Sequence, residues 1–276
     1  MPTATGEAAV ADTFEGARVL ITGGSSGIGA GLAEAFATAG ATVGIAARRR
    51  ERLAEVLERC RAHAPGSRMW SLDLTDDDAV DRLALEAVDQ LGGVDILVNN
   101  AGIPKRRHVT RLDPATVESV MAINYLSPVR LTLALLPQML ERGAGRIVSV
   151  SSVAAPLSSP GEAAYDASKA ALAVFSEAMA VDLWETGVKV TVVYPGVVDT
   201  ELFTLPDNDP FTAGVEAIPV GEAVRTIIDG IADGVLSIYV PEYFAKFASG
   251  KAQNVDGFLA GSAEFVRVQA ERASGR

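Results

Sequence analysis

Three side chains in the segment 145–172 have the types and spacing that can move a proton at a carbonyl oxygen. Tyr165 and Lys169 are four residues apart, so they share one face of a helix. Ser152 lies just beyond an apolar run that ends at Val150, where a strand would end. A free phenol has a pKa of about 10, and a fixed ammonium group beside it stabilises the phenolate. The pattern therefore predicts Tyr165 as general acid or base, with Lys169 lowering its pKa and Ser152 orienting the substrate oxygen.

The pair of Tyr165 and Lys169 also has a simpler interpretation, as two solvated residues on an Ala-rich helix. A tyrosine and a lysine at this spacing are common on helices, so the pair alone carries little information. The choice between the two interpretations depends on what the surrounding elements bring to the same place.

The elements around these residues alternate between two kinds of pattern. From Ala17 to Thr200, short apolar runs rich in Val and Ile are separated by Ala- and Leu-rich stretches of helical period. Strands that are apolar throughout are typical of a parallel sheet with both faces covered. The sequence therefore predicts an α/β fold, a single doubly wound parallel sheet of the Rossmann type with helices on both faces. Ligands of such sheets bind beyond the carboxyl ends of the strands.

The predicted domain runs from residue 16 to residue 276, after an N-terminal tail of residues 1–15 that we expect to be flexible. A chain of 276 residues with 49% hydrophobic content is long enough for one large core. The Pro-rich and acidic segment of about 201–219 has no clear period and is expected to form a substrate loop. A helix and a last strand follow it, and a C-terminal extension covers about 242–276.

A glycine-rich turn joins the first predicted strand to the first helix. Glycines here let the backbone approach a pyrophosphate, and the helix N-terminus offers free N–H groups and a partial positive charge. The spacing is G-x-x-x-G-x-G, and the alternative to a nucleotide site is an ordinary turn. Its position between a strand and a helix favours nucleotide binding by Gly23, Ser25, Ser26, Gly27, Ile28 and Gly29.

The end of the second predicted strand indicates which dinucleotide binds. An NAD site has an acidic residue here for the adenosine ribose hydroxyls, but this sequence has Ala47 followed by three arginines. Forked cationic donors suit a 2′-phosphate, so we expect NADP(H) in preference to NAD(H). Arg48 is the expected partner, together with Arg49 and a serine of the glycine turn, and the sequence does not decide between these arginines and Arg50. The alternative is a solvated basic first turn of the next helix.

Two further strand ends add to the predicted nucleotide site. Asp73 and Leu74 follow the third strand and are expected at the adenine edge. Asn100, Ala101 and Gly102 form a tight polar turn after the fourth strand and are expected against the ribose. Either motif alone would be uninformative, because polar turns are common after strands.

Composition argues against several other classes of function. The net charge of −11 disfavours a nucleic-acid partner, since phosphate binding requires clustered cations. One cysteine allows no internal disulfide, and two isolated histidines lack metal-ligand spacing, so no metal is expected. No window approaches about eighteen uninterrupted apolar residues, and the N-terminus does not resemble a secretion signal. We expect a cytoplasmic protein with a small-molecule substrate and no membrane span.

Taken together, the motifs between Ala17 and Thr200 resemble those of the short-chain dehydrogenase/reductase family. TGGSSGIG, LDLTD, NNAG, Asn124, Ser152, YDASK and YPGVVDT occur in the family's order and at its spacings. The resemblance implies that Asn124 completes a tetrad with Ser152, Tyr165 and Lys169 and organises a water through which protons pass. It also implies that Lys169 hydrogen-bonds the nicotinamide ribose, and that the nicotinamide end is bound by Pro195, Gly196, Val198 and Thr200.

The implied reaction is hydride transfer between NADP(H) and a carbonyl or secondary alcohol. The chain departs from many family members because it continues well past its last strand, as members acting on bulky apolar substrates do. Eight side chains could form an apolar mouth, but the favoured interpretation is that they pack the tail and loop against the body or a partner subunit. The candidates are Leu202, Phe203, Leu205, Phe211, Tyr239, Tyr243, Phe244 and Phe247.

Three other functions fit the same fold. A non-catalytic NADP(H)-binding sensor has no need of an intact tetrad, and an epimerase or dehydratase usually has a larger second domain than the roughly 75 residues after Thr200 provide. A scaffold would use only helical faces for assembly. The apolar faces of the helix after Pro114 and of the Tyr165 helix are also expected to make the enzyme a homo-oligomer, a dimer or tetramer.

Overall fold

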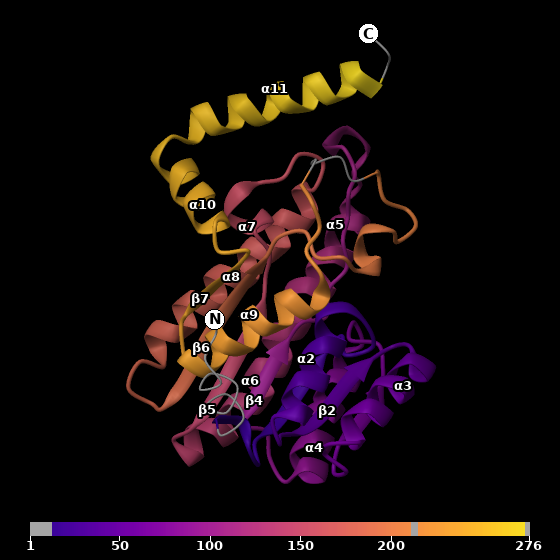
Figure 1. Cartoon of the computed structure of the whole chain (residues 1–276), viewed down its shortest axis with the longest axis vertical. Helices are drawn as coiled ribbons and strands as arrows, with labels where there is room; N and C mark the ends of the chain where they lie inside the picture. The colour runs from indigo at the N-terminus through magenta and orange to yellow at the C-terminus, as the bar shows by residue number, and fades with distance from the viewer. Residues whose placement is uncertain (1–12, 211–214, 274–276) are drawn as a thin grey trace, which may run out of the picture.

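A seven-stranded parallel sheet forms the centre of the computed structural model, which describes residues 13–210 and 215–273 (Figure 1). The strands are β1 Arg18–Thr22, β2 Thr42–Ala47, β3 Arg68–Ser71, β4 Ile96–Asn99, β5 Gly145–Val150, β6 Val188–Pro195 and β7 Ser237–Val240. They lie in the order β3-β2-β1-β4-β5-β6-β7, so the direction of winding reverses between β1 and β4. The predicted single doubly wound sheet is confirmed, and its ligand-binding edge is at the carboxyl ends of these strands.

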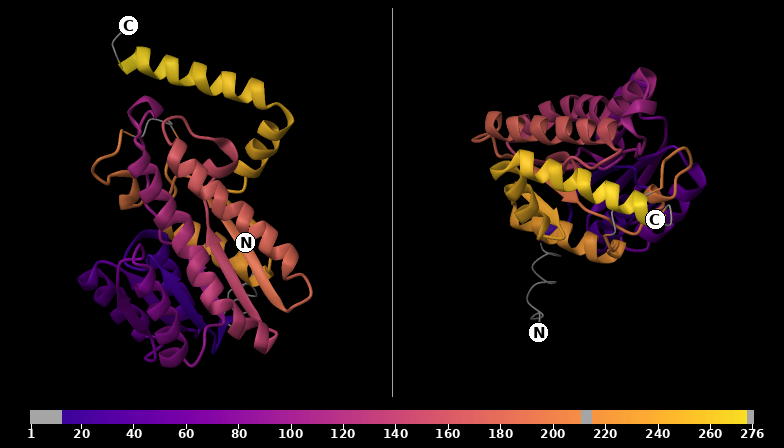
Figure 2. Two further views of the ribbon diagram at one scale, coloured as in Figure 1. Left: turned by 180° about the vertical axis from the view of Figure 1, so that it is seen from behind. Right: turned by 90° about the horizontal axis from the view of Figure 1, so that it is seen from above.

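Helices cover both faces of the sheet. One layer contains α2 (Gly27–Thr38), α3 (Arg50–Arg61) and α9 (Val220–Asp233). The other contains α4 (Asp77–Leu91), α6 (Ser127–Arg142) and α8 (Ala163–Asp182), and Figure 2 shows α6 and α8 along the rear face. The helix α5 (Pro114–Met121) leads into α6 through a π-helical turn, η2 (Ala122–Leu126), and the short α7 (Ala154–Leu157) follows β5.

Each strand supplies apolar side chains to both layers, because successive residues of a strand point to opposite faces. In β1, Val19 and Ile21 are buried against the layer of α2, α3 and α9, whereas Leu20 is buried against α4 and α6. In β4, Val98 and Leu97 repeat this division. Burial on both faces explains why the strands are continuous apolar runs in the sequence.

The segment predicted as a substrate loop leaves β6 and returns to the body just before α9. Val198 and Ile218 pair as an isolated parallel bridge, and the Asp199 N–H donates to the Ile218 carbonyl at 2.9 Å. These contacts close the base of the loop. A 3-10 turn, η3 (Glu201–Phe203), begins the loop. Residues 211–214, including the predicted mouth residue Phe211, lie outside the described residues.

The packed domain begins before residue 16. Phe14, which the sequence places in the flexible tail, is buried and packs edge to face on Phe36 with ring centroids 4.9 Å apart. Residues 1–12 lie outside the described residues. At the other end, the predicted C-terminal extension forms α10 (Phe244–Gln253) and α11 (Val255–Ala273), and α11 projects beyond the carboxyl edge of the sheet (Figures 1 and 2).

One helical stretch of the described chain, Pro114–Arg142, is long and apolar enough to cross a membrane by length and composition alone. Its apolar residues include Leu131 and Leu135, which are buried in the core beneath the sheet. The Arg130 guanidinium on its outer side hydrogen-bonds the Asp81 carboxylate of α4 at 2.6 and 2.7 Å. Packing within the fold therefore accounts for part of the apolar composition of this stretch, while Leu133 and Leu140 remain exposed.

Candidate active site

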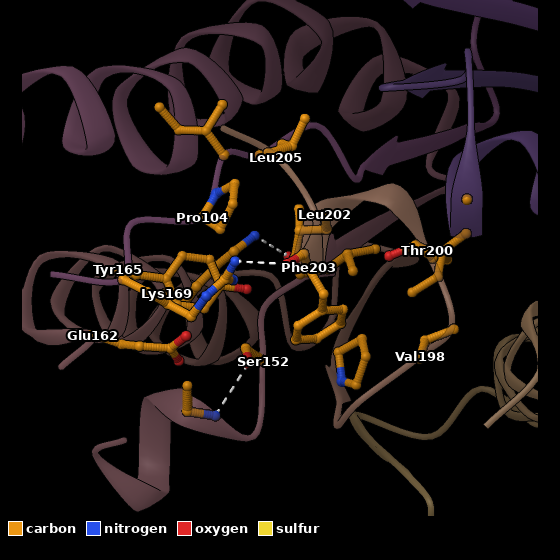
Figure 3. Close-up of a pocket in the computed structure, with 18 of the residues that line it drawn as sticks. Pro104, Ser152, Glu162, Tyr165, Lys169, Val198, Thr200, Leu202, Phe203 and Leu205 are labelled. Atoms are coloured by element: carbon orange, nitrogen blue, oxygen red, sulfur yellow. Dashed lines mark hydrogen bonds between the residues drawn. The ribbon is translucent and has the colours of Figure 1, made fainter. Parts of the chain in front are cut away.

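A cavity of about 990 Å³ lies at the carboxyl ends of the strands, where the predicted site residues come together (Figure 3). Its walls are formed by the turns after β1 to β6 and by the beginning of the substrate loop. All the predicted nucleotide-binding residues line it, as do Ser152, Tyr165 and Lys169. Asn124 is buried behind the wall. The sheet thus brings together residues that are more than 170 positions apart in the chain.

Ser152 and Tyr165 meet at the end of β5 and the beginning of α8. The Ser152 hydroxyl accepts a hydrogen bond from the Ala154 N–H at 3.1 Å, which fixes it at the first turn of α7. Burial of the Tyr165 phenol raises its pKa well above the usual value, while a hydrogen bond with Ser152 acts in the opposite direction. At neutral pH the phenol therefore carries its proton, as a general acid requires.

Lys169 lies one helical turn beyond Tyr165, as the spacing predicts, and is buried. Its ammonium donates to the Val150 carbonyl at 2.8 Å and lies 5.9 Å from the centre of the Tyr165 ring. Burial lowers the pKa of Lys169 to about 8. The structure places the amine beside the phenol ring, and the prediction that Lys169 lowers the Tyr165 pKa stays a prediction.

Asn124 occupies the π-helical turn η2, a local deformation of the helical stretch that runs from α5 into α6. Its side-chain carbonyl accepts from the Ile103 N–H at 2.8 Å, and its amide donates to the Ile103 carbonyl and to the Ser168 hydroxyl, each at 3.0 Å. Asn124 Oδ1 and Lys169 Nζ both lie 3.1 Å from the position that a Cβ on Gly102 would take. Asn124 thus ties the turn after β4 to α8 next to the lysine.

The glycine turn has the geometry of a phosphate-binding loop. Gly23 and Gly27 have positive φ values of +71° and +53°, which side-chain-bearing residues rarely adopt. A Cβ on Gly29 would lie 2.4 Å from the Gly23 carbonyl oxygen, so this position requires glycine. The N-cap Ser26 makes no capping hydrogen bond, and the first turn of α2 contains no acidic residue. The helix N-terminus can therefore bind the pyrophosphate of a dinucleotide.

Arginine and serine side chains gather at the end of β2. Arg49 donates to the hydroxyls of Ser25 and Ser26 at 3.2 and 2.8 Å. It also forms a salt bridge with Glu201 of the substrate loop, whose other carboxylate oxygen binds Arg52 at 2.6 Å. Arg48, the partner expected first, is exposed and lines the cavity. Arg49 is the arginine that contacts the serines of the glycine turn, while Arg50 begins α3 and is not part of the cavity wall.

The turns after β3 and β4 complete the nucleotide side of the cavity. The Asp73 carboxylate accepts from the N–H and hydroxyl of Thr75 at 2.9 and 2.8 Å, which lowers its pKa, and Leu74 is buried beside it. The Thr22 hydroxyl at the end of β1 accepts from the N–H groups of Asn100 and Ala101, each at 3.1 Å. The Asp73 contacts order the turn after β3, and the Thr22 contacts hold the turn after β4 against the end of β1.

The residues that the resemblance assigns to the nicotinamide end also line the cavity. Pro195 ends β6, and a Cβ on the next residue, Gly196, would lie 2.5 Å from the Phe244 ring. Val198 belongs to the bridge at the base of the loop. The Thr200 methyl carbon lies 3.0 Å from the position that a Cβ on Gly27 would take, so the loop begins directly against the glycine turn.

The candidates for an apolar mouth divide between the two interpretations that the sequence left open. Leu202, Phe203, Leu205 and Phe244 line the cavity, but Tyr239, Tyr243 and Phe247 do not. Tyr239 instead stacks on Tyr194, with ring centroids 4.6 Å apart, and Tyr243 packs on its helical neighbours. Two residues of α11, Phe265 and Val266, reach the cavity without any signal in the sequence.

Four charged residues of the cavity wall, Arg106, Glu162, Glu201 and Asp209, were not predicted. Glu201 binds the arginines described above. Arg106 is buried and donates to the carbonyls of Phe203 and Asp209, which fastens the substrate loop to the segment after β4. Burial raises the pKa of Glu162, which lies beside Ser152 and Tyr165 (Figure 3). For Arg106 the sequence shows only a basic run from Lys105 to Arg107. Its partners Phe203 and Asp209 lie far away along the chain, so no local pattern indicates the contacts.

The described residues hold no group of three or more His, Cys, Asp or Glu side chains that could bind a metal ion. Cys60 is buried, and burial raises the pKa of its thiol to about 11. A thiol with a raised pKa is a poor nucleophile and a poor metal ligand at neutral pH. Cys60 is not part of the cavity wall, which carries hydroxyl, amine and carboxyl groups.

Asp166, next to Tyr165, generates a testable dependence of stability on pH. Burial raises its pKa to about 8, and its Oδ1 has no hydrogen-bond partner among the described residues. An acid whose pKa is raised by folding stabilises the protein at low pH, and this contribution is lost as the pH rises from about 4 to about 8. In urea unfolding, Asp166→Asn should therefore gain stability relative to the wild type between pH 5 and pH 8. The exposed Asp182→Asn, at the end of the same helix, is the control. A constant difference between Asp166→Asn and the wild type would contradict this assignment.

Comparison with known proteins agrees with this geometry. The short chain dehydrogenase family matches residues 17–209. A short chain dehydrogenase of Pseudocercospora fijiensis is 38% identical over 223 residues, which cover 78% of this chain and 69% of the relative. An uncharacterized oxidoreductase of Myxococcus xanthus is 38% identical over 224 residues, covering 80% of this chain and 86% of the relative.

Solved structures show the same likeness. A short-chain dehydrogenase from Sphingobium yanoikuyae in complex with NADPH has a TM-score of 0.77 and 29% identity, covering 88% of this chain and 95% of its own. One from Burkholderia cenocepacia in complex with NADP has a TM-score of 0.77 and 29% identity, covering 90% and 98%. One from Burkholderia phymatum in complex with NAD has a TM-score of 0.79 at 22% identity, covering 88% and 95%, which shows the shared fold. The chain belongs to the short chain dehydrogenase family and is an oxidoreductase that binds a nicotinamide cofactor.

Proposed function

We propose that this oxidoreductase transfers hydride between NADP(H) and a carbonyl or secondary alcohol on a bulky or apolar substrate. One observation carries the proposal: Ser152 and Tyr165 line the same cavity as the glycine turn at the N-terminus of α2. A proton donor and a dinucleotide site thus line one cavity that is large enough for a substrate. The bound nicotinamide supplies the hydride acceptor or donor, and the protein supplies alignment and protons.

Tyr165 and Ser152 act on the substrate oxygen. In the reductive direction the oxygen gains negative charge, which the Ser152 hydroxyl stabilises by a hydrogen bond while the Tyr165 phenol donates its proton. The raised pKa of the Tyr165 phenol keeps that proton in place at neutral pH. In the oxidative direction the phenol must first be deprotonated. Stabilisation of the phenolate by the nearby Lys169 ammonium therefore matters more in this direction than in the reductive one.

Lys169 and Asn124 support the proton supply. Because burial lowers the Lys169 pKa to about 8, its amine exchanges protons readily near neutral pH. Asn124 binds both backbone groups of Ile103 and lies beside Lys169 across Gly102. We assign two roles to Asn124: it positions the turn after β4, and it holds a water that returns protons to Lys169 and Tyr165. We also assign Lys169 to a hydrogen bond with the nicotinamide ribose.

The substrate side of the cavity favours bulky apolar compounds. Leu202, Phe203 and Leu205 of the loop face the catalytic groups, as Figure 3 shows, and Phe244 and Phe265 extend the apolar wall from the C-terminal extension. Apolar walls with few polar groups are typical of small-molecule sites.

A panel of carbonyls and secondary alcohols with both cofactors should give net NADPH consumption or formation, which a sensor or an epimerase would not.

Replacing the phenol tests the mechanism. Tyr165→Phe should retain NADPH binding, because the cradle is unchanged, but lose turnover by about 100-fold or more, because the proton donor is gone. The measurement is NADPH absorbance with the best substrate of the panel, together with a fluorescence titration of NADPH. Tyr243→Phe, outside the cavity, is the matched control. Turnover close to that of the wild type in Tyr165→Phe would remove the phenol from the mechanism.

The preference for NADP(H) is supported by the cations at the end of β2. Arg49, held by Ser25 and Ser26, already binds a carboxylate there, and Arg48 lies beside it on the cavity wall. Two of the structural relatives are complexes with NADPH or NADP and one is a complex with NAD. The fold accepts either cofactor, so the arginines are the basis for the preference.

Arginine variants test this preference. Arg49→Ala and Arg48→Ala should each raise the Kd of NADPH by about 10- to 100-fold, the usual effect of losing a charge-assisted hydrogen bond. The Kd of NADH should change much less. Arg50→Ala, whose side chain is exposed outside the cavity wall, is the control. Equal weakening of NADPH and NADH would show that neither arginine recognises the 2′-phosphate.

We also propose a homo-oligomer, built on the outer faces of α6 and α8. Val174 and Val181 of α8 are 63% and 72% exposed, and Trp184 just beyond it is 79% exposed. Leu133 and Leu140 of α6 have the same seven-residue spacing and are also exposed.

Sedimentation should show a dimer or tetramer that Val181→Arg weakens, whereas Leu85→Arg on α4 should not weaken it. A monomeric wild type would contradict this assembly. The cytoplasmic location stays a prediction.

A further inference from the structure

The Glu201 carboxylate is bound by cations that belong to the cofactor side of the cavity. It forms a salt bridge with Arg49, accepts from Arg52 at 2.6 Å and accepts from the Ser26 hydroxyl at 2.8 Å. Ser26 precedes α2, Arg49 lies between β2 and α3, and Arg52 lies in the first turn of α3. All three are at least 149 residues away from Glu201 in the chain. An acidic residue of the substrate loop thus occupies an anion site at the dinucleotide end.

This anion site coincides with the expected position of the 2′-phosphate. Arg49 follows the end of β2, where the adenosine ribose is recognised in this fold. Ser26 precedes the N-terminus of α2, where the pyrophosphate binds. A carboxylate and a phosphate attract the same forked donors, so both groups suit the guanidinium of Arg49. The same Arg49 nitrogen, Nη2, contacts both Ser26 and Glu201, so a phosphate bound to this nitrogen would take the place of the Glu201 carboxylate.

We propose that Glu201 is a specificity-determining residue whose carboxylate competes with the 2′-phosphate for Arg49, Arg52 and Ser26. NADPH must displace Glu201, whereas NADH, which has no 2′-phosphate, leaves it in place. The inference rests on the proposed function only in that the cofactor site accepts a 2′-phosphate. Because the Glu201 carboxylate occupies these partners in the apoenzyme, the affinity for NADPH is lowered and the affinity for NADH is unchanged.

The network around Glu201 is more than an isolated surface pair. Single exposed ion pairs contribute little, but Glu201 has three hydrogen-bonding partners, and these hold its pKa near 2. The second arginine, Arg52, is not part of the cavity wall and still turns toward the loop. A carboxylate with this low pKa is ionised at all physiological pH values, so the competition is present throughout that range.

Displacement of Glu201 also changes the substrate loop. Glu201 begins η3, and the next residues, Leu202 and Phe203, form part of the substrate wall. The far end of the loop is held separately, since Asp207 binds Lys105 and Arg107. NADPH therefore removes one anchor of the first turn of the loop, while Arg106 still holds the Phe203 carbonyl and Lys105 still holds Asp207. The 2′-phosphate and the apolar substrate wall become coupled through one side chain.

The test is a comparison of Glu201→Gln with the wild type in fluorescence titrations with NADPH, NADH and adenosine 2′,5′-bisphosphate. If Glu201 occupies the site nine-tenths of the time, its removal tightens 2′-phosphate ligands about tenfold. We expect that gain for NADPH and for the bisphosphate, and a change of less than about twofold for NADH. Glu201→Ala, which also removes the remaining hydrogen bond, should give the same gain. Asp207→Asn removes a charge from the same loop away from Arg49 and should change none of the three.

A second readout follows the loop itself. In the wild type, NADPH should speed hydrogen exchange of the Phe203 and Thr204 amides relative to NADH, because their turn loses its anchor at Glu201. This difference should vanish in Glu201→Gln. Unchanged NADPH affinity in both Glu201 variants, or equal exchange with the two cofactors, would overturn the proposal. A wild type that prefers NADH would instead contradict the cofactor preference proposed above, while tightening of NADPH by Glu201→Gln would still support competition.

Discussion

The close approach of the turns after β1 and β4 is the constraint on which the rest of the site depends. The Thr22 hydroxyl accepts two N–H groups from the β4 turn, and the Asn100 amide donates back to the Thr22 carbonyl at 2.9 Å. A Cβ on Gly29 would collide with both turns. Because these turns touch, the N-terminus of α2 lies over the point where the winding of the sheet reverses. The dinucleotide cradle and the catalytic edge therefore share one cavity.

Burial sets the electrostatics of the proposed catalytic groups. The Tyr165 phenol has a raised pKa and keeps its proton near pH 7, whereas Lys169, with a pKa lowered to about 8, is still mostly an ammonium there. Glu162 and Asp166, on either side of the tyrosine, also have raised pKa values. The protonated phenol avoids the cost of an unpaired buried charge, and the hydrogen bond to the Val150 carbonyl offsets that cost for the Lys169 ammonium. Charge that develops on a substrate oxygen, or arrives with a cofactor, then has a large effect on the protonation of these groups.

The parts of the site that depend on strand ends could be predicted from the sequence. Apolar runs locate the strands, and the parallel sheet brings their carboxyl ends to one edge, so Gly23, Asn100 and Ser152 met as expected. Contacts made by loops followed no local pattern. Glu201 meets Ser26 across 175 positions and Arg106 meets Phe203 across 97, and no periodicity specifies such pairs. The sequence left two places open for the Tyr239 ring, and the structure shows it packed inside the fold on Tyr194.

The bridge between Val198 and Ile218 separates the substrate loop from the strands that carry the proposed nucleotide-binding and catalytic groups. The loop leaves and returns at this bridge, so its two ends are fixed at one place. Insertions, deletions or new side chains between Val198 and Ile218 would remodel the space for the substrate and leave the strand ends where they are. Substrate specificity can therefore change within one contiguous stretch of chain, while the groups proposed to transfer protons stay in place.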